Sequence, residues 1–476
     1  MSSKPLPIPN EDCPTDYDDG TIPPQYKNVV EDPEDNDGEV KGLKDEEKSD
    51  PFMTTISIVK NILGSGILNF PVIIRTLGIV PGCVVIFLLG VVAFLTSDYL
   101  LQCKTITRKY GYSMYGKITL GSLGTILVKL MLAIGNFGFS CVYYKVFGNL
   151  MDVVITTIAG RTERTEFYLQ PWFFITLAFF IIIPLIVVDN QSLLNKASVF
   201  GIVGLSTFLL LILVIFLKKF FSGEVHYDNS MLWPKADGGF IEILGSLPTV
   251  ILAFSFHFNV FPIYFTLKHR TNKEMLISTS VAISLSFFFY VGVGLLGYLM
   301  YSNSEIGVQS IMINNLQNDL TIMNEDPSKK STLLYMFYLI GIIAFLLSCV
   351  ITVPLVFIGT KTHFMNLILF VKRKNHALIT SSNISISSFQ KLLITLILYG
   401  GVLFVTLTVD NIMMLFSFIG STSSSAISLI LPGLFLILLL KSTGIDDGKY
   451  WAMFVIGLGI VGIISFYVPE IIKFFK

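Results

Sequence analysis

Two apolar stretches of this sequence contain the residues whose types and spacing favour binding chemistry. The first runs Asn61-Ile62-Leu63-Gly64-Ser65-Gly66-Ile67 and reaches Pro71 one turn later. The second follows Pro248 and runs Ala253-Phe254-Ser255-Phe256-His257-Phe258-Asn259, with Pro262 beyond it. Glycine pairs and prolines favour interruption of a helix, because they loosen or remove backbone hydrogen bonds. An interrupted helix leaves amide and carbonyl groups available to a ligand.

The chemistry expected of such interruptions is the binding of a small molecule that carries both charges. Amides at a broken helix end favour an anion, and unwound carbonyls favour a cation. A zwitterionic amino acid places both charges a few Å apart. The alternative is that Gly64, Ser65 and Gly66 only allow close packing of helices, as small residues do in membranes.

The composition predicts that these stretches lie in a membrane. Of 476 residues, 53% are apolar and 14% are charged, whereas soluble proteins average about 25% charged residues. This excludes a soluble enzyme, a nucleic-acid-binding protein and a disordered scaffold. The five cysteines are scattered and form no C-x-x-C pair, so we expect no zinc site and no disulfide framework. We therefore expect a polytopic membrane protein with a lipid bilayer around it and no metal or cofactor.

Charge divides the chain into two parts. Residues 1–52 contain 5 Lys against 15 Asp and Glu, a net charge of −10, and are rich in proline. We predict a disordered acidic tail there, and a membrane domain over 53–476. Lysine and arginine are denser in alternate loops, which places the N-terminus in the cytosol.

Apolar runs long enough to cross about 30 Å of hydrocarbon recur through the membrane domain. They predict an all-α protein with eleven transmembrane helices, at 56–74, 79–101, 126–148, 172–188, 197–217, 244–267, 275–300, 332–358, 389–409, 412–440 and 451–472. The two interrupted stretches fall in the first and sixth helices. Matching interruptions in two halves are typical of transporters built from inverted repeats. We expect repeats over about 56–217 and 244–440, with 451–472 as an extra helix.

The sequence resembles the amino acid/auxin permease family over roughly residues 53–472. The run IVKNILGSGILNFP from Ile58 to Pro71 is similar to the family's first-helix pattern N-x-x-x-G-[SA]-G-[IT]-L. The run LPTVILAFSFHFNVFPIY from Leu247 to Tyr264 is similar to its sixth-helix pattern, and His257 falls on the family histidine. Thr352-Val353-Pro354 and the run Leu431–Phe435 resemble two later motifs, and all four occur in the family's order.

The resemblance implies a LeuT-type fold and secondary active transport of amino acids. It implies that the amides of Ser65, Gly66 and Ile67, next to Gly64, hold the substrate carboxylate. The carbonyls around Phe254, Ser255 and Phe256 would take the ammonium group, with the Ser255 hydroxyl as a further candidate.

The coupling ion is the point where the sequence departs from the sodium-coupled members. They resemble this chain except for an asparagine one turn before Gly-x-Gly, where this chain has Lys60. An ammonium 4 Å from a sodium ion would cost about 4 kcal/mol at an effective dielectric of 20. Lys60 could replace the ion, carry the proton or extend to the membrane surface. His257 is a second proton candidate, or a neutral histidine bonded inside the bundle. Thr352 retains a hydroxyl of the family's sodium site.

We therefore predict a transporter of neutral amino acids, with a proton as the coupling ion. The alternatives are a sodium-coupled symporter and a transporter-like amino acid sensor. No histidine stands in an H-E-x-x-H or similar catalytic pattern, so we expect no enzyme. Outer loops without cysteines or glycosylation sequons favour a vacuolar or lysosomal membrane. The sequence gives no indication of the oligomeric state.

Overall fold

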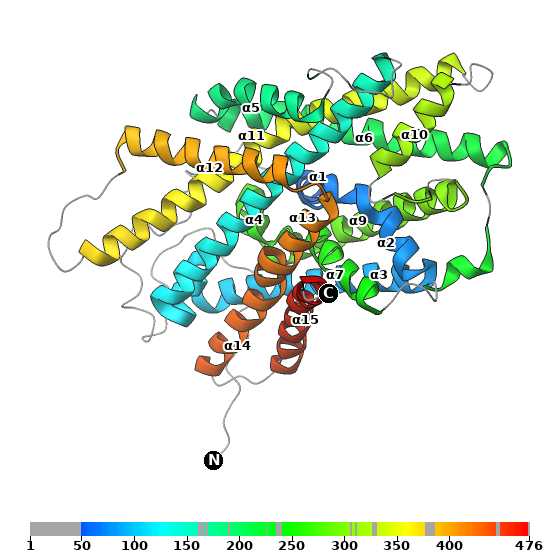
Figure 1. Cartoon of the computed structure of the whole chain (residues 1–476). Helices are drawn as coiled ribbons and strands as arrows, with labels where there is room; N and C mark the ends of the chain where they lie inside the picture. The colour runs from blue at the N-terminus through cyan, green and yellow to red at the C-terminus, as the bar shows by residue number, and fades with distance from the viewer. Residues whose placement is uncertain are drawn as a thin grey trace.

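The computed structural model describes residues 49–159, 167, 170–188, 191–225, 227–234, 240–304, 307–309, 312–325, 331–376, 386–443 and 448–474. Most of these residues are helical, as Figure 1 shows. The α-helices are α1 (Pro51–Ile62), α2 (Phe70–Leu77), α3 (Ile79–Thr107), α4 (Tyr112–Ala159), α5 (Pro171–Val188), α6 (Gln191–Phe221), α7 (Phe240–Ala253), α8 (Val260–Thr266), α9 (Asn272–Tyr301), α10 (Met312–Glu325), α11 (Thr332–His376), α12 (Ser388–Thr408), α13 (Ile412–Ile419), α14 (Leu431–Thr443) and α15 (Lys449–Phe474).

Five short helical turns complete the described elements. Three are 3-10 turns, η3 (Ser65–Asn69), η5 (Asn229–Leu232) and η6 (His257–Asn259), and two are π-helical turns, η8 (Gly420–Ser424) and η9 (Ala426–Ile430). The turns η3 and η6 fall inside the two stretches that the sequence marked for interruption. The predicted acidic tail of residues 1–52 lies outside the described residues except for its last four.

The helices are long and apolar enough to cross a membrane. Within the described part of the chain, nine segments meet this condition by length and composition, and the bent pair α1 and η3–α2 makes ten. The remaining expected span corresponds to α5, whose apolar part, Pro171–Val187, is shorter. A multi-pass membrane protein is thus confirmed, while the number of eleven is reached only if α5 is included. Helical structure follows from the lipid, since only internal hydrogen bonds can satisfy the backbone there.

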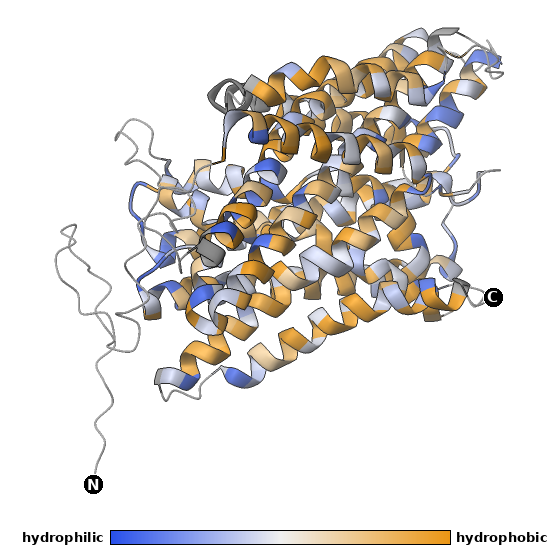
Figure 2. Cartoon of the chain, turned by 60° about the vertical axis from the view of Figure 1, so that its left-hand side comes forward, coloured by the Kyte–Doolittle hydropathy of each residue, from blue (hydrophilic) through white to orange (hydrophobic). Residues whose placement is uncertain are grey.

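Apolar residues form a band through the middle of the molecule, and polar residues gather at its two sides (Figure 2). Large apolar side chains such as Phe87, Phe180, Phe288 and Phe404 are exposed around this band. Their exposure fits contact with lipid rather than with water. We call the side on which α1 begins the N-terminal face. The side on which α2 ends and α10 lies is the far face.

Close helix contacts hold the bundle together around α4, α11 and α6. Small residues allow these contacts: a Cβ at Gly204 of α6 would lie 2.3 Å from the Ala344 carbonyl oxygen of α11. At Gly341 of α11 it would lie 2.7 Å from a Leu211 methyl group. Such approach is characteristic of membrane helices, where van der Waals packing must replace hydrophobic association. The bundle therefore provides a close-packed frame around the interrupted spans.

The first and sixth spans are each two helices joined by an irregular segment. Helix α1 bends by 51° into the segment that contains η3 and α2. Helix α7 ends at Ala253, and α8 begins at Val260. The two spans also meet at the N-terminal face, where the Ser49 amide donates to the Thr266 carbonyl at 2.7 Å. The interruptions predicted from glycine and proline are therefore present in both spans.

Candidate functional site

The interruption of the first span centres on Gly64. Its backbone is extended, with φ −116° and ψ −159°, between the end of α1 and the start of η3. A Cβ at Gly64 would lie 3.0 Å from the Tyr143 hydroxyl of α4, whereas one at Gly66 would meet only Phe416, at 3.9 Å. Glycine at Gly64 thus allows α4 to approach closely. At Gly66 the protein leaves room, which suits a site for a ligand.

Tyr143 is a candidate functional residue that the sequence did not reveal. Its hydroxyl lies close to Ser65 and interacts electrostatically with the backbone amide and the side chain of that residue. Ser65 is buried and Tyr143 is only half-buried. The Tyr143 hydroxyl therefore lies beside the backbone of the first interruption, where it could donate to a bound carboxylate. Tyrosine within an apolar run gives no local signal of this role.

The interruption of the sixth span retains several local backbone hydrogen bonds. The Ser255 amide donates to Leu252 at 3.0 Å, and the Phe256 amide donates to Phe254 at 3.1 Å. The Phe256 carbonyl in turn accepts from Asn259 at 2.9 Å. Each carbonyl oxygen has two lone pairs, so these local bonds leave acceptor capacity for a substrate ammonium group.

Ser255 uses its hydroxyl for contact with the tenth span. Its Oγ lies 2.7 Å from Oγ of Ser428 in η9. In η8, a Cβ at Gly420 would lie 2.0 Å from the Pro248 carbonyl oxygen, so this π-helical turn runs directly against α7. Phe254, Ser255 and Phe256 are all buried. The hydroxyl of Ser255 thus ties the interruption of the sixth span to η9.

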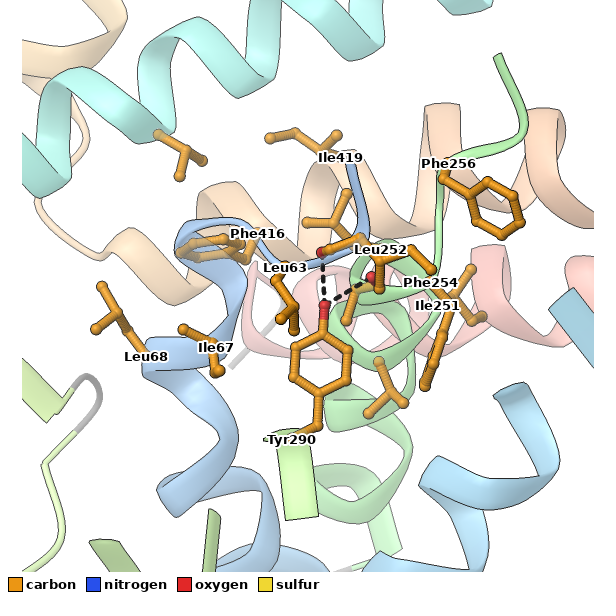
Figure 3. Packing of buried hydrophobic residues seen from close by; sticks show 14 of the residues in the cluster. Leu63, Ile67, Leu68, Ile251, Leu252, Phe254, Phe256, Tyr290, Phe416 and Ile419 are labelled. Carbon is orange, nitrogen blue, oxygen red and sulfur yellow. Dashed lines mark hydrogen bonds between the residues drawn. The ribbon is translucent and has the colours of Figure 1, made fainter. Parts of the chain in front are cut away.

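Two links join the interruptions to each other. Nδ2 of Asn259 donates to Oδ1 of Asn61 at 2.5 Å. The Tyr290 hydroxyl of α9 lies within hydrogen-bond distance of the Ile62 and Ala253 carbonyls, as the dashed lines in Figure 3 show. The fold therefore brings together the two sets of backbone groups that the sequence placed in separate spans.

The surroundings of the first interruption are apolar. Figure 3 shows Phe416 of α13 beside Leu63, with Ile419 above both. Ile419 also fills the space next to Gly138 of α4, where a Cβ would lie 2.4 Å from the Ile419 Cγ1 atom. These side chains offer contacts to an uncharged apolar group rather than to a charged one.

His257 lies away from the first interruption and binds α3. Its Nε2 lies 2.7 Å from Oγ1 of Thr96 and 3.1 Å from the Ala93 carbonyl oxygen. The Thr96 hydroxyl donates to the Val92 carbonyl at 3.0 Å, so it is available as an acceptor for the imidazole N–H. His257 is fully buried, and Nδ1 has no hydrogen-bond partner among the described residues. This arrangement matches the alternative of a histidine bonded within the bundle.

Lys60 and Thr352 occupy different surroundings. Lys60 lies in the last turn of α1 and is exposed. The Thr352 hydroxyl donates to the Ser348 carbonyl at 2.8 Å, and Ser348 in turn donates to Gly201 of α6. Thr352 thus lies on the side of α11 that packs against α6. Among the described residues, no group of three or more His, Cys, Asp or Glu side chains could hold a metal ion.

Comparison with known sequences gives one consistent result. The family model for transmembrane amino acid transporter proteins matches residues 47–469. Amino acid transporter AVT6E of Arabidopsis thaliana is 22% identical, over 97% of this chain and 93% of the relative. Vacuolar amino acid transporter 7 of Saccharomyces cerevisiae is 26% identical, over 58% of this chain and 54% of the relative. Sodium-coupled neutral amino acid transporter 7 of Danio rerio is 22% identical, over 56% of this chain and 57% of the relative.

A solved structure shares the fold. MhsT, determined in complex with L-phenylalanine, aligns over 87% of this chain and 97% of its own length. The TM-score is 0.51 and the sequence identity is 12%, so the likeness concerns the fold alone. The family match covers most of the chain, including both interrupted spans. The chain therefore belongs to the family of transmembrane amino acid transporter proteins and is a transport protein rather than an enzyme.

Proposed function

We propose that this chain carries neutral amino acids across a membrane by alternating access, with protons as the driving ion. The observation that carries the proposal is the geometry at Ser65. Ser65 is buried between Gly64, where a Cβ would lie 3.0 Å from the Tyr143 hydroxyl, and Gly66, where a Cβ would meet only Phe416, at 3.9 Å. A substrate carboxylate would accept from the amides of this segment, since amides at a broken helix end favour an anion.

The apolar residues near the first interruption favour substrates with uncharged side chains. Phe416 lies beside the first interruption (Figure 3), and Ile419 follows one turn later in α13, so a substrate side chain would extend toward them. A charged side chain there would lose its hydration without gaining a partner from these two residues. The ammonium group would be accepted by the carbonyls of Phe254, Ser255 and Phe256.

Alternating access is supported by a difference between the two faces. On the far face, Nη1 of Arg75 in α2 donates to the Val308 carbonyl at 2.7 Å, and α10 packs against η3. At the end of α1, next to the first interruption, Lys60 and Asn61 are exposed. A path closed on one side and accessible from the other is what a carrier needs in one of its two states.

Proton coupling is favoured by Lys60, whose charge opposes a sodium ion near the end of α1. The vacuolar relatives favour an internal, acid-containing compartment. Together with the loop charges, they support an N-terminus in the cytosol and a far face toward that compartment. Thr352 faces α6, so it would bind a sodium ion only if other residues supplied the remaining ligands.

Uptake of a labelled amino acid mixture into proteoliposomes tests the proposal, with pH and sodium gradients imposed separately. Uptake driven by external acid without sodium is the expected result, and vesicles with Gly66→Val serve as the matched control. Uptake that requires sodium would overturn the proton coupling. Binding without uptake under either gradient would overturn transport and favour a sensor.

A further inference from the structure

The Tyr290 hydroxyl joins the ends of two half-helices. Its oxygen lies 2.7 Å from the Ile62 carbonyl oxygen and 2.8 Å from the Ala253 carbonyl oxygen. Ile62 is the last residue of α1, and Ala253 is the last residue of α7. One side chain of α9 therefore contacts the C-terminal end of the first half of both interrupted spans (Figure 3).

Two helix C-termini create a negative electrostatic potential where they meet. The last carbonyls of a helix lack intrahelical donors, and each C-terminus carries roughly half a negative charge. In transporters with broken helices, such ends and the unwound carbonyls beside them coordinate a monovalent cation. A phenol has one proton to donate, so it supplies a partial positive charge where an ion would supply a full one.

The tyrosine ring is fixed by the same two spans. It stacks on Phe70, the first residue of α2, with ring centroids 4.1 Å apart and planes 6° apart. The Phe254 ring, just after α7, meets it edge-on at 5.4 Å and 85°. Tyr290 is completely buried. Since both aromatic partners belong to the interrupted spans, the hydroxyl cannot leave its position unless the spans rearrange around it.

We infer that the Tyr290 hydroxyl takes the place of a monovalent cation between the two interruptions, so that the substrate site forms without sodium at that position. This inference rests on the proposed function, because it explains how such a site works with a proton gradient alone. Tyr290 is thus a residue that determines ion specificity. It holds the C-terminal ends of α1 and α7 next to each other and does not itself bind the amino acid.

The variant Tyr290→Phe tests this role, because it removes one oxygen and keeps the aromatic contacts with Phe70 and Phe254. In choline medium, acid-driven uptake should fall at least tenfold from that of the unmodified chain. Addition of sodium or lithium should restore a substantial part of it, whereas uptake by the unmodified chain should be the same in choline and sodium. Tyr298→Phe on the same helix is the matched control and should show no response to sodium.

Thermal unfolding of the purified full-length protein in detergent gives a second readout that needs no transport. Sodium should raise the unfolding temperature of Tyr290→Phe and leave the unmodified chain and Tyr298→Phe unchanged. An equal response of all three proteins to sodium, or none in Tyr290→Phe, would overturn the inference. If the unmodified chain transported no amino acid, the proposed function would fail, while the ion response of Tyr290→Phe would still decide the role of the hydroxyl.

Discussion

The Nζ atom of Lys219, near the end of α6, lies 2.9 Å from Oδ1 of Asp319 in the middle of α10. The other carboxylate oxygen accepts from the Tyr301 hydroxyl at 2.6 Å and from the Tyr338 hydroxyl at 2.7 Å. The Lys219 ammonium also lies over the Tyr301 ring, 4.2 Å from its centroid. Asp319 thus ties α10 to α6, α9 and α11 on the far face, where α10 packs against η3.

Asp319→Asn should loosen α10. The variant leaves the largely buried Lys219 ammonium without its carboxylate, which costs on the order of 3 kcal/mol when one partner of a buried pair is removed. A cysteine introduced at Leu316, which is fully buried in α10, should then be labelled by a thiol reagent about a hundredfold faster. The double change Lys219→Gln with Asp319→Asn should recover part of the protection, because it leaves no unpaired charge. Equal labelling in all variants would show that this cluster does not hold α10.

Tyr143→Phe should weaken substrate binding. The change removes a hydroxyl beside the first interruption that would donate to the substrate carboxylate, and a hydrogen bond of this kind contributes about 1 kcal/mol, or about fivefold in KM. The maximal uptake rate should change little if the hydroxyl binds substrate equally throughout the cycle. Tyr144→Phe is the control, because that hydroxyl bonds to Tyr399 of α12 instead. A rise in KM of the same size in both variants would contradict a specific role for Tyr143.

Gly66→Val should abolish uptake and leave folding intact. A Cβ at Gly66 is in ordinary contact with Phe416, at 3.9 Å, so the protein itself tolerates the first added carbon. The valine methyl groups would occupy the space assigned to the substrate. Uptake, together with the amount of protein in the membrane and its unfolding temperature, separates the two effects. Normal uptake by this variant would refute the assignment of the site to the first interruption.

His257→Gln should retain acid-driven uptake within about threefold. The glutamine Nε2 can take the position of the imidazole Nε2 and donate to Thr96 or Ala93. His257→Ala leaves the buried Thr96 oxygen without this partner, which costs about 1–3 kcal/mol, and should lower the unfolding temperature. The pH profile of uptake decides the question. Loss of acid-driven uptake in His257→Gln, with amino acid exchange preserved, would identify the histidine as a proton carrier.

Lys60→Ala should change the pH dependence of uptake more than the KM for the amino acid. Lys60 lies at the exposed end of α1, beside the first interruption but outside its buried part. Its protonation would therefore influence the movement of α1 rather than contact with the substrate. Lys60→Arg is the charge-preserving control. Measurement of initial uptake rates between pH 5 and pH 8 compares the three proteins, and coincident profiles would exclude Lys60 from coupling.

The sequence by itself determined where the helices lie and where two of them are interrupted. Lipid requires that apolar runs satisfy their own backbone hydrogen bonds, so the runs became helices. Glycine and proline act on the residues next to them, so Gly64, Gly66 and the stretch between Pro248 and Pro262 marked the interruptions correctly. The ends of the helices were less accessible: α11 continues as helix beyond residue 358 to His376, and α4 runs from Tyr112 to Ala159 with a kink at Gly121, whose φ is 67°.

Only the tertiary structure decided which side chains complete the site. Tyr143 and Tyr290 lie in apolar runs of the third and seventh spans, and nothing in their neighbours along the chain distinguishes them from other tyrosines. Their roles arise because α4 and α9 pack against the interruptions, at distances that depend on every helix between them. In the same way, the Ser255 hydroxyl pairs with Ser428, 173 residues away. Backbone preferences are local and can be read from a sequence, whereas the partner of a side chain is set by packing.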